Sequence, residues 1–415
     1  MAKTPGATFH HIPEFLPDGH RFLFSTFGGG NTAGTYIASV DAPGERQRLA
    51  QGGRRRVYAG GHLLFVREGT LFAQPFDPQR AVLGGEPVAI APSVSTWTNN
   101  EGFAWFAVSP AGTLAYFSGA GVRGQVQLAW VDRNGRQLAN VGAPGNFGQI
   151  ALSPDERHVA LEVAAPRKEF DLWVMDIARG VASRVTSAPG SERDPVWARD
   201  GRSLAFLART PKGPSLRLKG LRASDPETVV EAGAGPDENV PETWVPDGDT
   251  LLVIRRNAKD EQTVWAAPLK GGKAEPVLSG FRFDEPQVSP DGRWLAYVSN
   301  ESGQDDVYVE PFRREGDRVR ISVKGGGQPK WRADGRELFL TTLTNRLLAV
   351  QVRAAGERLD VSLPAELFEI RGLQGSGYDD YAPSSDGQRF LVKVPVEQDL
   401  KPVLNVVTNW TSLLR

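Results

Sequence analysis

A short phrase recurs along this chain and limits what the chain can fold into. Its clearest copy, residues 286–312, reads PQVSPDGRWLAYVSNESGQDDVYVEPF. Pro290-Asp291-Gly292 suits a tight turn, because proline fixes φ, aspartate bonds its own backbone and glycine takes a positive φ. The residues after this corner alternate with a period of two, and a second strand follows a break at 300–303. Each copy therefore predicts one small antiparallel sheet.

Nine copies of this phrase can be counted along the chain. Their corners fall near positions 18, 60, 111, 155, 200, 247, 291, 334 and 386, which are 42 to 52 residues apart. This spacing is typical of a four-stranded propeller blade of about 40 to 50 residues, and the period of 3.6 that marks amphipathic helices is absent from the sequence. We predict an all-β fold, a β-propeller of four-stranded antiparallel blades, with residues 1–415 forming a single domain and one closed nine-bladed ring.

Two other arrangements of the repeats remain open. One has three partial-propeller units in residues 1–145 and a six-bladed ring in 146–415, and another has eight blades. The ninth unit has recognisable sequence for only three strands, and residues 6–12 precede the first corner strand without another partner. We therefore expect residues 6–12 to complete the last blade, which would remove two sheet edges, and expect deletion of residues 1–12 to lower the melting temperature.

Composition and charge exclude several classes of protein. The chain has 40% hydrophobic and 23% charged residues, a formal net charge of −1 and no cysteine. It is therefore expected to fold, to make no disulfide and to lack the field that attracts nucleic acid or anionic membranes. The first residues lack the apolar stretch of a signal peptide and no window suggests a membrane span. We expect a soluble monomer, cytoplasmic by default, or extracytoplasmic if the chain is a segment of a longer membrane-tethered protein.

The repeated corner carries a resemblance to a known family. SPDG followed by a strand and then by a D-[LV]-[WY]-V strand resembles the PD40, or TolB-like, propeller repeats, relatives of WD40, over nearly the whole chain. More narrowly, residues 292–303, 306–312, 127–135 and 386–392 resemble the C-terminal repeat region of bacterial, notably acidobacterial, serine/threonine protein kinases. The resemblance implies a propeller that senses or binds something. The sequence has no glycine-rich ATP loop, HRD-type loop or DFG, so kinase activity does not carry over.

Several motifs with chemical associations have simpler explanations. Gly119–Gly124 matches G-x-G-x-x-G but joins two predicted strands, and Gly375-Ser376-Gly377 lacks the setting of a nucleophile elbow. His10, His11 and His20 lack further zinc ligands, and the twelfth position of a calcium-type loop starting at Asp132 is Ala143. We interpret these four features as two hairpin loops, a set of surface or packing histidines, and a hairpin turn.

A set of acidic and amide residues just before the corner strands is the candidate binding site. The corner strand of a propeller blade is the innermost one, so residues at its N-terminal end line one mouth of the central channel. Like charges gathered there favour a positive ligand, although solvated turn residues are the plainer interpretation. The candidates are Asp194, Glu242, Asp284, Glu285, Gln328, Asp379 and Asp380.

Two hypotheses for function follow. The first is a non-catalytic propeller that binds a protein, peptide or small molecule at the channel mouth, without a cofactor. The alternative is a metal-dependent hydrolase of the lactonase or esterase type, which is weakened because His158 is the one histidine after residue 62. Trp197, Trp244 and Trp331 recur three residues before the corner position, where Phe15 and Val288 also occur. We therefore assign them to packing between blades.

Overall fold

The computed structural model describes residues 9–27, 34–51, 55–67, 69–95, 104–109, 111–118, 125–164, 170–188, 190–210, 213–222, 224–230, 238–257, 261–269, 272–356, 358–370, 379–396 and 403–414. These residues form antiparallel sheets, and a short 3-10 helix follows the last strand. The chain divides into two compact units, residues 1–124 with 397–415 and residues 125–396. The all-β, TolB-like propeller class is confirmed, whereas the number of blades in one ring and the closure of that ring stay predictions.

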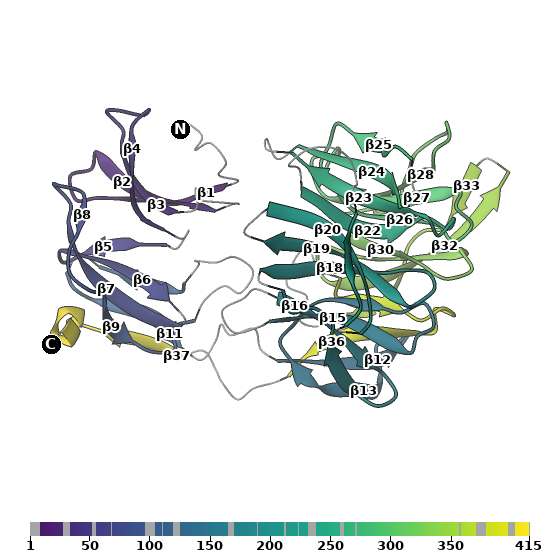
Figure 1. The fold of residues 1–415 in the computed structure, drawn as a ribbon, viewed down its shortest axis with the longest axis horizontal. Coiled ribbons are helices and arrows are strands. Elements are labelled where there is room, and N and C mark those ends of the chain that lie inside the picture. Colours follow the sequence, from purple (N-terminus) through teal and green to yellow (C-terminus); the bar gives the residue numbers. More distant parts are fainter. Residues whose placement is uncertain are drawn as a thin grey trace. The chain divides into compact units, whose positions relative to one another are not determined.

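The first unit holds three sheets (Figure 1). The first sheet contains β1 (Phe9–Phe15), β2 (Arg21–Phe27), β3 (Gly34–Ser39) and β4 (Arg46–Gln51). The second contains β5 (Val57–Ala59), β6 (His62–Arg67), β7 (Thr70–Asp77), β8 (Val82–Leu83) and β9 (Val88–Ala91). The third contains β10 (Phe106–Val108), β11 (Leu114–Ser118) and β37 (Val403–Val407), and the 3-10 helix η2 (Trp410–Leu414) follows it.

The second unit holds six sheets. The first contains β14 (Phe147–Leu152), β15 (His158–Ala164), β16 (Phe170–Asp176) and β17 (Val181–Arg184). The second contains β18 (Ser191–Trp197), β19 (Ser203–Thr210), β20 (Gly213–Gly220) and β21 (Glu227–Val229). The third contains β22 (Glu238–Trp244), β23 (Thr250–Arg256), β24 (Gln262–Pro268) and β25 (Glu275–Ser279). The fourth contains β26 (Phe283–Val288), β27 (Trp294–Ser299), β28 (Asp306–Pro311) and β29 (Val319–Arg320). The fifth contains β30 (Gly327–Trp331), β31 (Glu337–Thr341), β32 (Arg346–Ala355), β33 (Arg358–Val361) and β34 (Ala365–Glu369).

The sixth sheet joins two distant parts of the sequence. It consists of β13 (Gln137–Gly145), β12 (Val126–Asp132), β36 (Arg389–Pro395) and β35 (Tyr381–Pro383), in that order. Figure 1 shows the yellow β36 beside the blue β12, and Trp130 pairs with Leu391 in their ladder. The innermost strands contact one another in the order β14, β18, β22, β26 and β30, and β35 contacts β14. Tyr381 of β35 also donates to the Gln328 carbonyl of β30, so the six sheets contact one another in a circuit.

The predicted closing strand is wrong. Strand β1, which contains residues 9–12 of the expected closing stretch, pairs with β2 in the first sheet, and the partner of β36 is β12. The third repeat is thus split, because its β11 pairs with β37 in the first unit while β12 belongs to the second. A strand's apolar pattern shows that it needs a partner but not which one. The boundaries at 124/125 and 396/397 also differ from the expected alternative boundary at 145/146.

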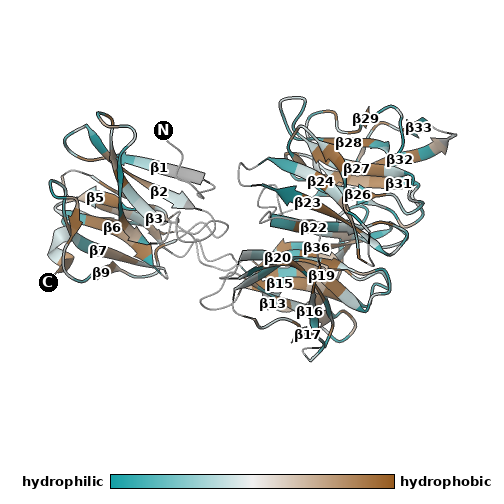
Figure 2. Cartoon of the chain, turned by 45° about the horizontal axis from the view of Figure 1, so that its top comes forward, coloured by the Kyte–Doolittle hydropathy of each residue, from teal (hydrophilic) through white to brown (hydrophobic). Residues whose placement is uncertain are grey.

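The corners and the packing between sheets agree with the sequence. Gly292 has φ +73° and its N–H donates to the Ser289 carbonyl, while the Ser289 hydroxyl donates to Asp291 at 2.6 Å. Figure 2 shows apolar colour concentrated along the strands and hydrophilic colour in the turns. Trp197 and Trp244 are buried in clusters that join neighbouring sheets, and Trp331 packs partly buried against another. The core therefore lies between the blades, as predicted for these tryptophans.

Candidate functional site

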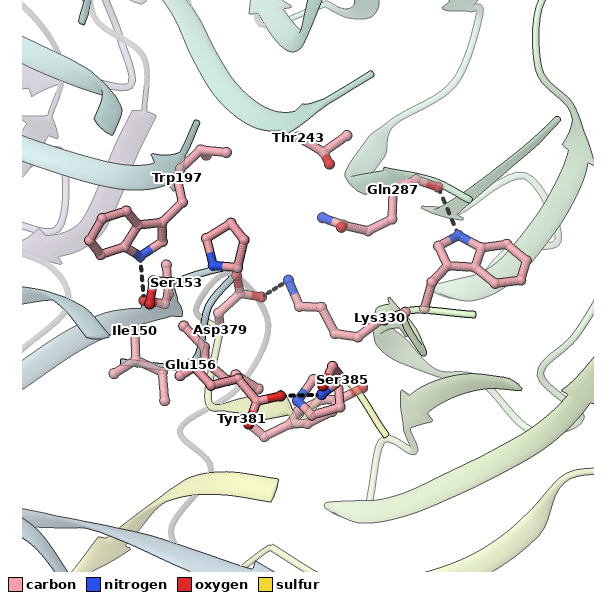
Figure 3. A pocket seen from close by; sticks show the side chains of 18 of the residues that line it. Ile150, Ser153, Glu156, Trp197, Thr243, Gln287, Lys330, Asp379, Tyr381 and Ser385 are labelled. Carbon is pink, nitrogen blue, oxygen red and sulfur yellow. Dashed lines mark hydrogen bonds and ion pairs between the residues drawn. The ribbon is translucent and has the colours of Figure 1, made fainter. Parts of the chain in front are cut away.

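A cavity of about 360 Å³ lies inside the second unit. Each of the six innermost strands contributes to its wall, among them through Ile150, Val196, Thr243, Gln287, Lys330 and Tyr381. Figure 3 shows the Lys330 side chain extending across the cavity toward Asp379. This volume is at the lower end of the range for small-molecule sites, roughly 300 to 1,000 Å³. The centre of the six-sheet circuit is therefore large enough for a small ligand or one side chain of a peptide.

The inner strands share a bulge near the cavity. Asp194 in β18, Glu285 in β26 and Gln328 in β30 have φ values of 55°, 54° and 52°. At these positions the strand loses register with its neighbour, as a bulge with one extra residue requires. Left-handed conformations are unfavourable for residues other than glycine, so the surrounding contacts must hold them.

Glu285 and Gln328 bind the backbone of the following blade. The carboxylate of Glu285 accepts a hydrogen bond from the Gln328 backbone N–H. Gln328 in turn accepts from the Asp380 N–H at 3.1 Å, and its own amide donates to the Asp380 carboxylate at 3.3 Å. The Tyr381 hydroxyl donates to the Gln328 carbonyl at 2.7 Å. These two candidates therefore connect neighbouring blades and do not line the cavity.

Asp379 and Asp380 are adjacent but have different roles. Asp380, 4% exposed, forms an ion pair with Lys393, which also donates to the Gly148 carbonyl at 2.9 Å and so links the closing sheet to β14. Burial raises the pKa of the Asp380 carboxyl, and the Lys393 charge opposes that rise. Asp379 lines the cavity, with Lys330 Nζ at 2.7 Å from its carboxylate.

Asp284 is held beside its own strand. Its carboxylate accepts from Arg282 at 2.7 Å, and it is absent from the cavity wall. Burial raises the pKa of the Asp284 carboxyl, whereas the Arg282 charge acts in the opposite direction. This candidate therefore has a local partner and does not line the cavity.

Glu242 is the candidate that faces the cavity without a partner. Its half-buried side chain lines the wall, and the described residues supply it with no hydrogen bond or ion pair. Burial raises the pKa of Glu242 well above its usual range, and the charges of Asp194, Asp284, Glu285 and Asp379 raise it further. An unpaired carboxylate in such a place is costly when ionised, so a cation near it would be stabilised.

Two other carboxyls of this region share that electrostatic environment. Burial, with the nearby Glu162 charge, raises the pKa of Asp194 to about 7. Burial, with the Asp379 charge, raises the pKa of Glu285 to about 8. Burial alone would lower the pKa of Lys330, but Asp379, followed by Glu285 and Glu242, outweighs it and the pKa is raised. Among the residues that line the cavity, the carboxyl groups of Glu156, Glu242 and Asp379 outnumber the one cationic side chain, Lys330.

Sequence reasoning missed three residues of this region. Glu162, 0% exposed in β15, accepts from the Asp194 N–H at 2.7 Å and from the Gln149 N–H at 3.2 Å. Lys330 and Lys393 supply the cations that pair with Asp379 and Asp380. A charged residue inside an apolar strand was the signal available for Glu162, since such a residue must find a buried partner.

The other motifs have ordinary roles or fall outside the described residues. Asp132 accepts from the Asn134 and Arg136 N–H groups, which is the predicted hairpin turn. His20 pairs with Asp41 at 2.9 Å on the surface. The loops at 119–124 and 375–377 and the side chains of His10 and His11 lie outside the described residues. Among the residues described, no group of three or more His, Asp or Glu side chains is arranged to hold a metal ion.

Comparisons with known proteins support the fold. A putative TolB from Agrobacterium tumefaciens aligns with a TM-score of 0.50 and 16% identity over 66% of this chain and 99% of that one. TolB from Acinetobacter baumannii aligns with a TM-score of 0.46 and 15% identity over 76% of this chain and 82% of that one. The first of these likenesses confirms a TolB-like β-propeller, and at such identity it shows the fold alone.

Sequence relatives cover shorter parts of the chain. Tricorn protease homolog 1 from Streptomyces coelicolor is 36% identical over 90 residues, 20% of this chain and 8% of that protein. The uncharacterized peptidase YuxL from Bacillus subtilis is 26% identical over 197 residues, 37% of this chain and 30% of that protein. The chain thus matches less than a third of either relative's length. No family model matches the chain, and in the described part no helix is long and apolar enough to cross a membrane.

Proposed function

We propose that the second unit is a non-catalytic binding module that holds a peptide or small ligand carrying a basic group in its central cavity. The observation that carries this proposal is Glu242, a carboxylate on the cavity wall that forms no ion pair with the described residues, while Lys330 nearby is paired with Asp379. A ligand cation would satisfy the remaining charge, and interactions of this kind are charge-assisted hydrogen bonds.

The hydroxyl groups of the cavity support binding over nucleophilic chemistry. Ser153 and Ser384 line the wall, and each donates at 2.6 Å to the aspartate of its own corner, Asp155 or Asp386. A serine nucleophile instead needs a general base to accept its proton. These serines therefore belong to the turns that shape the cavity.

The curated relatives favour a peptide among the ligand classes. Both matched proteins are named as a protease or a peptidase. A sensor or scaffold role, as in the propellers that follow bacterial kinase domains, fits binding without turnover.

Binding can be tested with three short probes. N-acetylated glycine-Xaa-glycine amides carrying lysine, norleucine or glutamate at Xaa would be titrated into the full chain by calorimetry. We expect the lysine peptide to bind most tightly and the glutamate peptide least, and we expect each peptide to be recovered intact. Hydrolysis of a p-nitrophenyl ester that requires added Ca²⁺ would instead favour the metal-dependent alternative.

A blocking variant shows whether the cavity is the place of binding. Thr243 lines the wall, so Thr243→Phe should remove the binding of all probes. Thr228, exposed on the outer strand β21, gives the matched control Thr228→Phe, which should leave binding unchanged. Binding that survives Thr243→Phe, or no binding of any probe by the native chain, would overturn the proposal.

A further inference from the structure

A hydrogen bond between neighbouring blades recurs around the cavity. In each case a side chain of one blade accepts from the backbone N–H of the residue six positions before the corner of the next, which in β18 and β30 is the bulge residue. Glu162 accepts from Asp194, Glu285 accepts from Gln328, and Gln328 accepts from Asp380. We call this contact the junction bond. Among the described residues it is present at three of the six junctions between blades, those of β15 with β18, β26 with β30 and β30 with β35.

The junction between β18 and β22 cannot make this bond. The bulge position of β22 is occupied by Pro241, which has no backbone N–H to donate and a φ fixed near about −65°. Accordingly, Pro241 stays in register opposite Val253, and the irregularity follows it, before Thr243. Asp194, Glu285 and Gln328 stand directly before a proline, whereas Glu242 stands directly after one. This reversed order in the sequence is what places Glu242 on the cavity wall.

The missing junction bond leaves acceptors unused on both sides of this junction. Asp194 is the counterpart of Glu285, yet within the described residues its carboxylate has no hydrogen-bond donor, and neither does that of Glu242. Of the neighbouring charges, Asp194 acts most strongly on Glu242. Glu242 on the cavity wall and Asp194 at the bulge of the preceding blade therefore lie close enough to interact, and neither forms an ion pair with a described residue. The charges of Arg193 and Arg209 nevertheless act to lower the pKa of Asp194.

A second bond is missing at the same junction. Trp197 donates its indole N–H to the Ala151 carbonyl of the preceding blade at 2.8 Å, and Trp331 donates to Gln287 at 3.1 Å. Trp244 is their counterpart in β22 and is 9% exposed, but its buried indole N–H has no acceptor among the described residues. Trp244 therefore lacks the contact between blades that Trp197 and Trp331 make, which is a second, independent difference at this junction.

We propose that the β18–β22 junction is a subsite for a primary ammonium group, which donates to the carboxylates of Glu242 and Asp194 in place of the missing junction bond. This inference rests on the proposed function and locates its ligand's charge. An ammonium has three donors and no acceptor, so it can bridge two carboxylates. The same cavity already holds one such pair, Lys330 with Asp379. The shared chemistry is a primary amine, from a lysine side chain, a peptide α-amine or a small diamine.

The test compares Glu242, at the junction without the junction bond, with Glu285, which makes that bond. The probes are the acetylated glycine-lysine-glycine amide, a glycine-norleucine-glycine amide with a free α-amine, and 1,5-diaminopentane. We expect Glu242→Gln to weaken the binding of an amine probe at least tenfold and Asp194→Asn about three- to tenfold. Glu285→Gln is the matched control, since it removes a nearby carboxyl group but keeps an oxygen that accepts from Gln328. It should change affinity less than twofold.

The outcomes separate this subsite from the wider proposal. Comparable losses in Glu242→Gln and Glu285→Gln would show that overall charge matters and not the junction, which overturns the subsite. Unchanged affinity in Glu242→Gln with binding still blocked by Thr243→Phe would also overturn the subsite and leave cavity binding in place. Comparison of the three probes identifies the source of the amine. Circular dichroism melting curves would confirm that each variant folds.

Discussion

The two sides of the central cavity are built from the same repeat but differ in how their blades meet. On the side of β26, β30 and β35, Glu285, Gln328 and Asp380 are joined by a chain of hydrogen bonds from blade to blade. At the β18–β22 junction, Pro241 interrupts that pattern, and Glu242 is left on the wall. One repeat position thus joins neighbouring blades at three junctions, whereas at the β18–β22 junction we propose that it serves recognition.

The largest change in stability is expected where the sheet of β12 and β36 meets β14, at Lys393. Lys393→Met removes the cation paired with buried Asp380 and the donor to the Gly148 carbonyl. Breaking a buried ion pair by removing one partner typically costs about 3 to 5 kcal/mol, because a charge stays uncompensated. We expect a loss of this size in the free energy of unfolding, measured by urea denaturation of the full chain. The double variant Lys393→Met/Asp380→Leu should recover most of it, and failure to recover would mean that the Gly148 contact dominates.

A second expected effect is the pH dependence of stability at the β26–β30 junction, where Glu285 accepts from Gln328. The pKa of Glu285 is about 8 in the folded state, above its ordinary value of 4.5, because of burial and the Asp379 charge. The folded state therefore binds this proton more tightly than the unfolded state does. Its contribution to stability is complete below about pH 4.5 and is lost as pH rises toward 8, with a slope of at most about 1.4 kcal/mol per pH unit.

Urea denaturation at several pH values checks this dependence. Glu285→Gln has no proton to bind, so its stability should fall less steeply between pH 5 and 8 than that of the native chain. Glu315→Gln changes an exposed carboxylate outside the cavity and serves as the control. Equal slopes in the native chain and Glu285→Gln would assign the pH dependence to other carboxyls.

The tryptophans provide a smaller and more local comparison. Trp197→Phe removes the indole donor to Ala151, whereas Trp244→Phe removes an N–H that has no acceptor among the described residues. A hydrogen bond contributes a net of about 0.5 to 1.5 kcal/mol. Both variants lose similar apolar area, so Trp197→Phe should be about 1 kcal/mol less stable than Trp244→Phe. Equal stabilities in thermal or urea unfolding would indicate that Trp244 has an acceptor after all.

The sequence carried enough information for the repeats but not for the connections between them. The Pro-Asp-Gly corners, such as that at Gly292, depend on local backbone preferences and were predicted correctly. The pairing of β12 with β36 joins residues more than 250 positions apart. Such pairing depends on which edges remain free in the folded chain, and local pattern does not encode it. The N-terminal closing strand was therefore predicted in the wrong sheet.

The candidate site was likewise predictable from the sequence only in part. The position before the corner strand was found because it repeats, and Glu242 and Asp379 do line the cavity. Glu285, Gln328 and Asp380 instead bond to backbone or to lysine, which depends on the bulge and on cations from other strands. The sequence did show one informative irregularity, the order Pro241-Glu242 where other blades have the polar residue first. Its meaning required knowledge of the junction bond.

The smallest expected change in stability gives the sharpest test of the comparison. Pro241→Ala restores a backbone N–H at the bulge position of β22, which Asp194 can then accept as Glu285 accepts that of Gln328. Substitutions to or from proline that fit the backbone change stability by about 0.4 to 1 kcal/mol, so the variant should fold normally. Its affinity for the acetylated glycine-lysine-glycine amide should nevertheless fall about fivefold, because Asp194 is no longer free for the ammonium. Pro286→Ala, directly after Glu285 at a junction that already has its bond, should leave affinity unchanged. If Pro241→Ala binds the lysine peptide as tightly as the native chain, then the missing junction bond is not what makes the site.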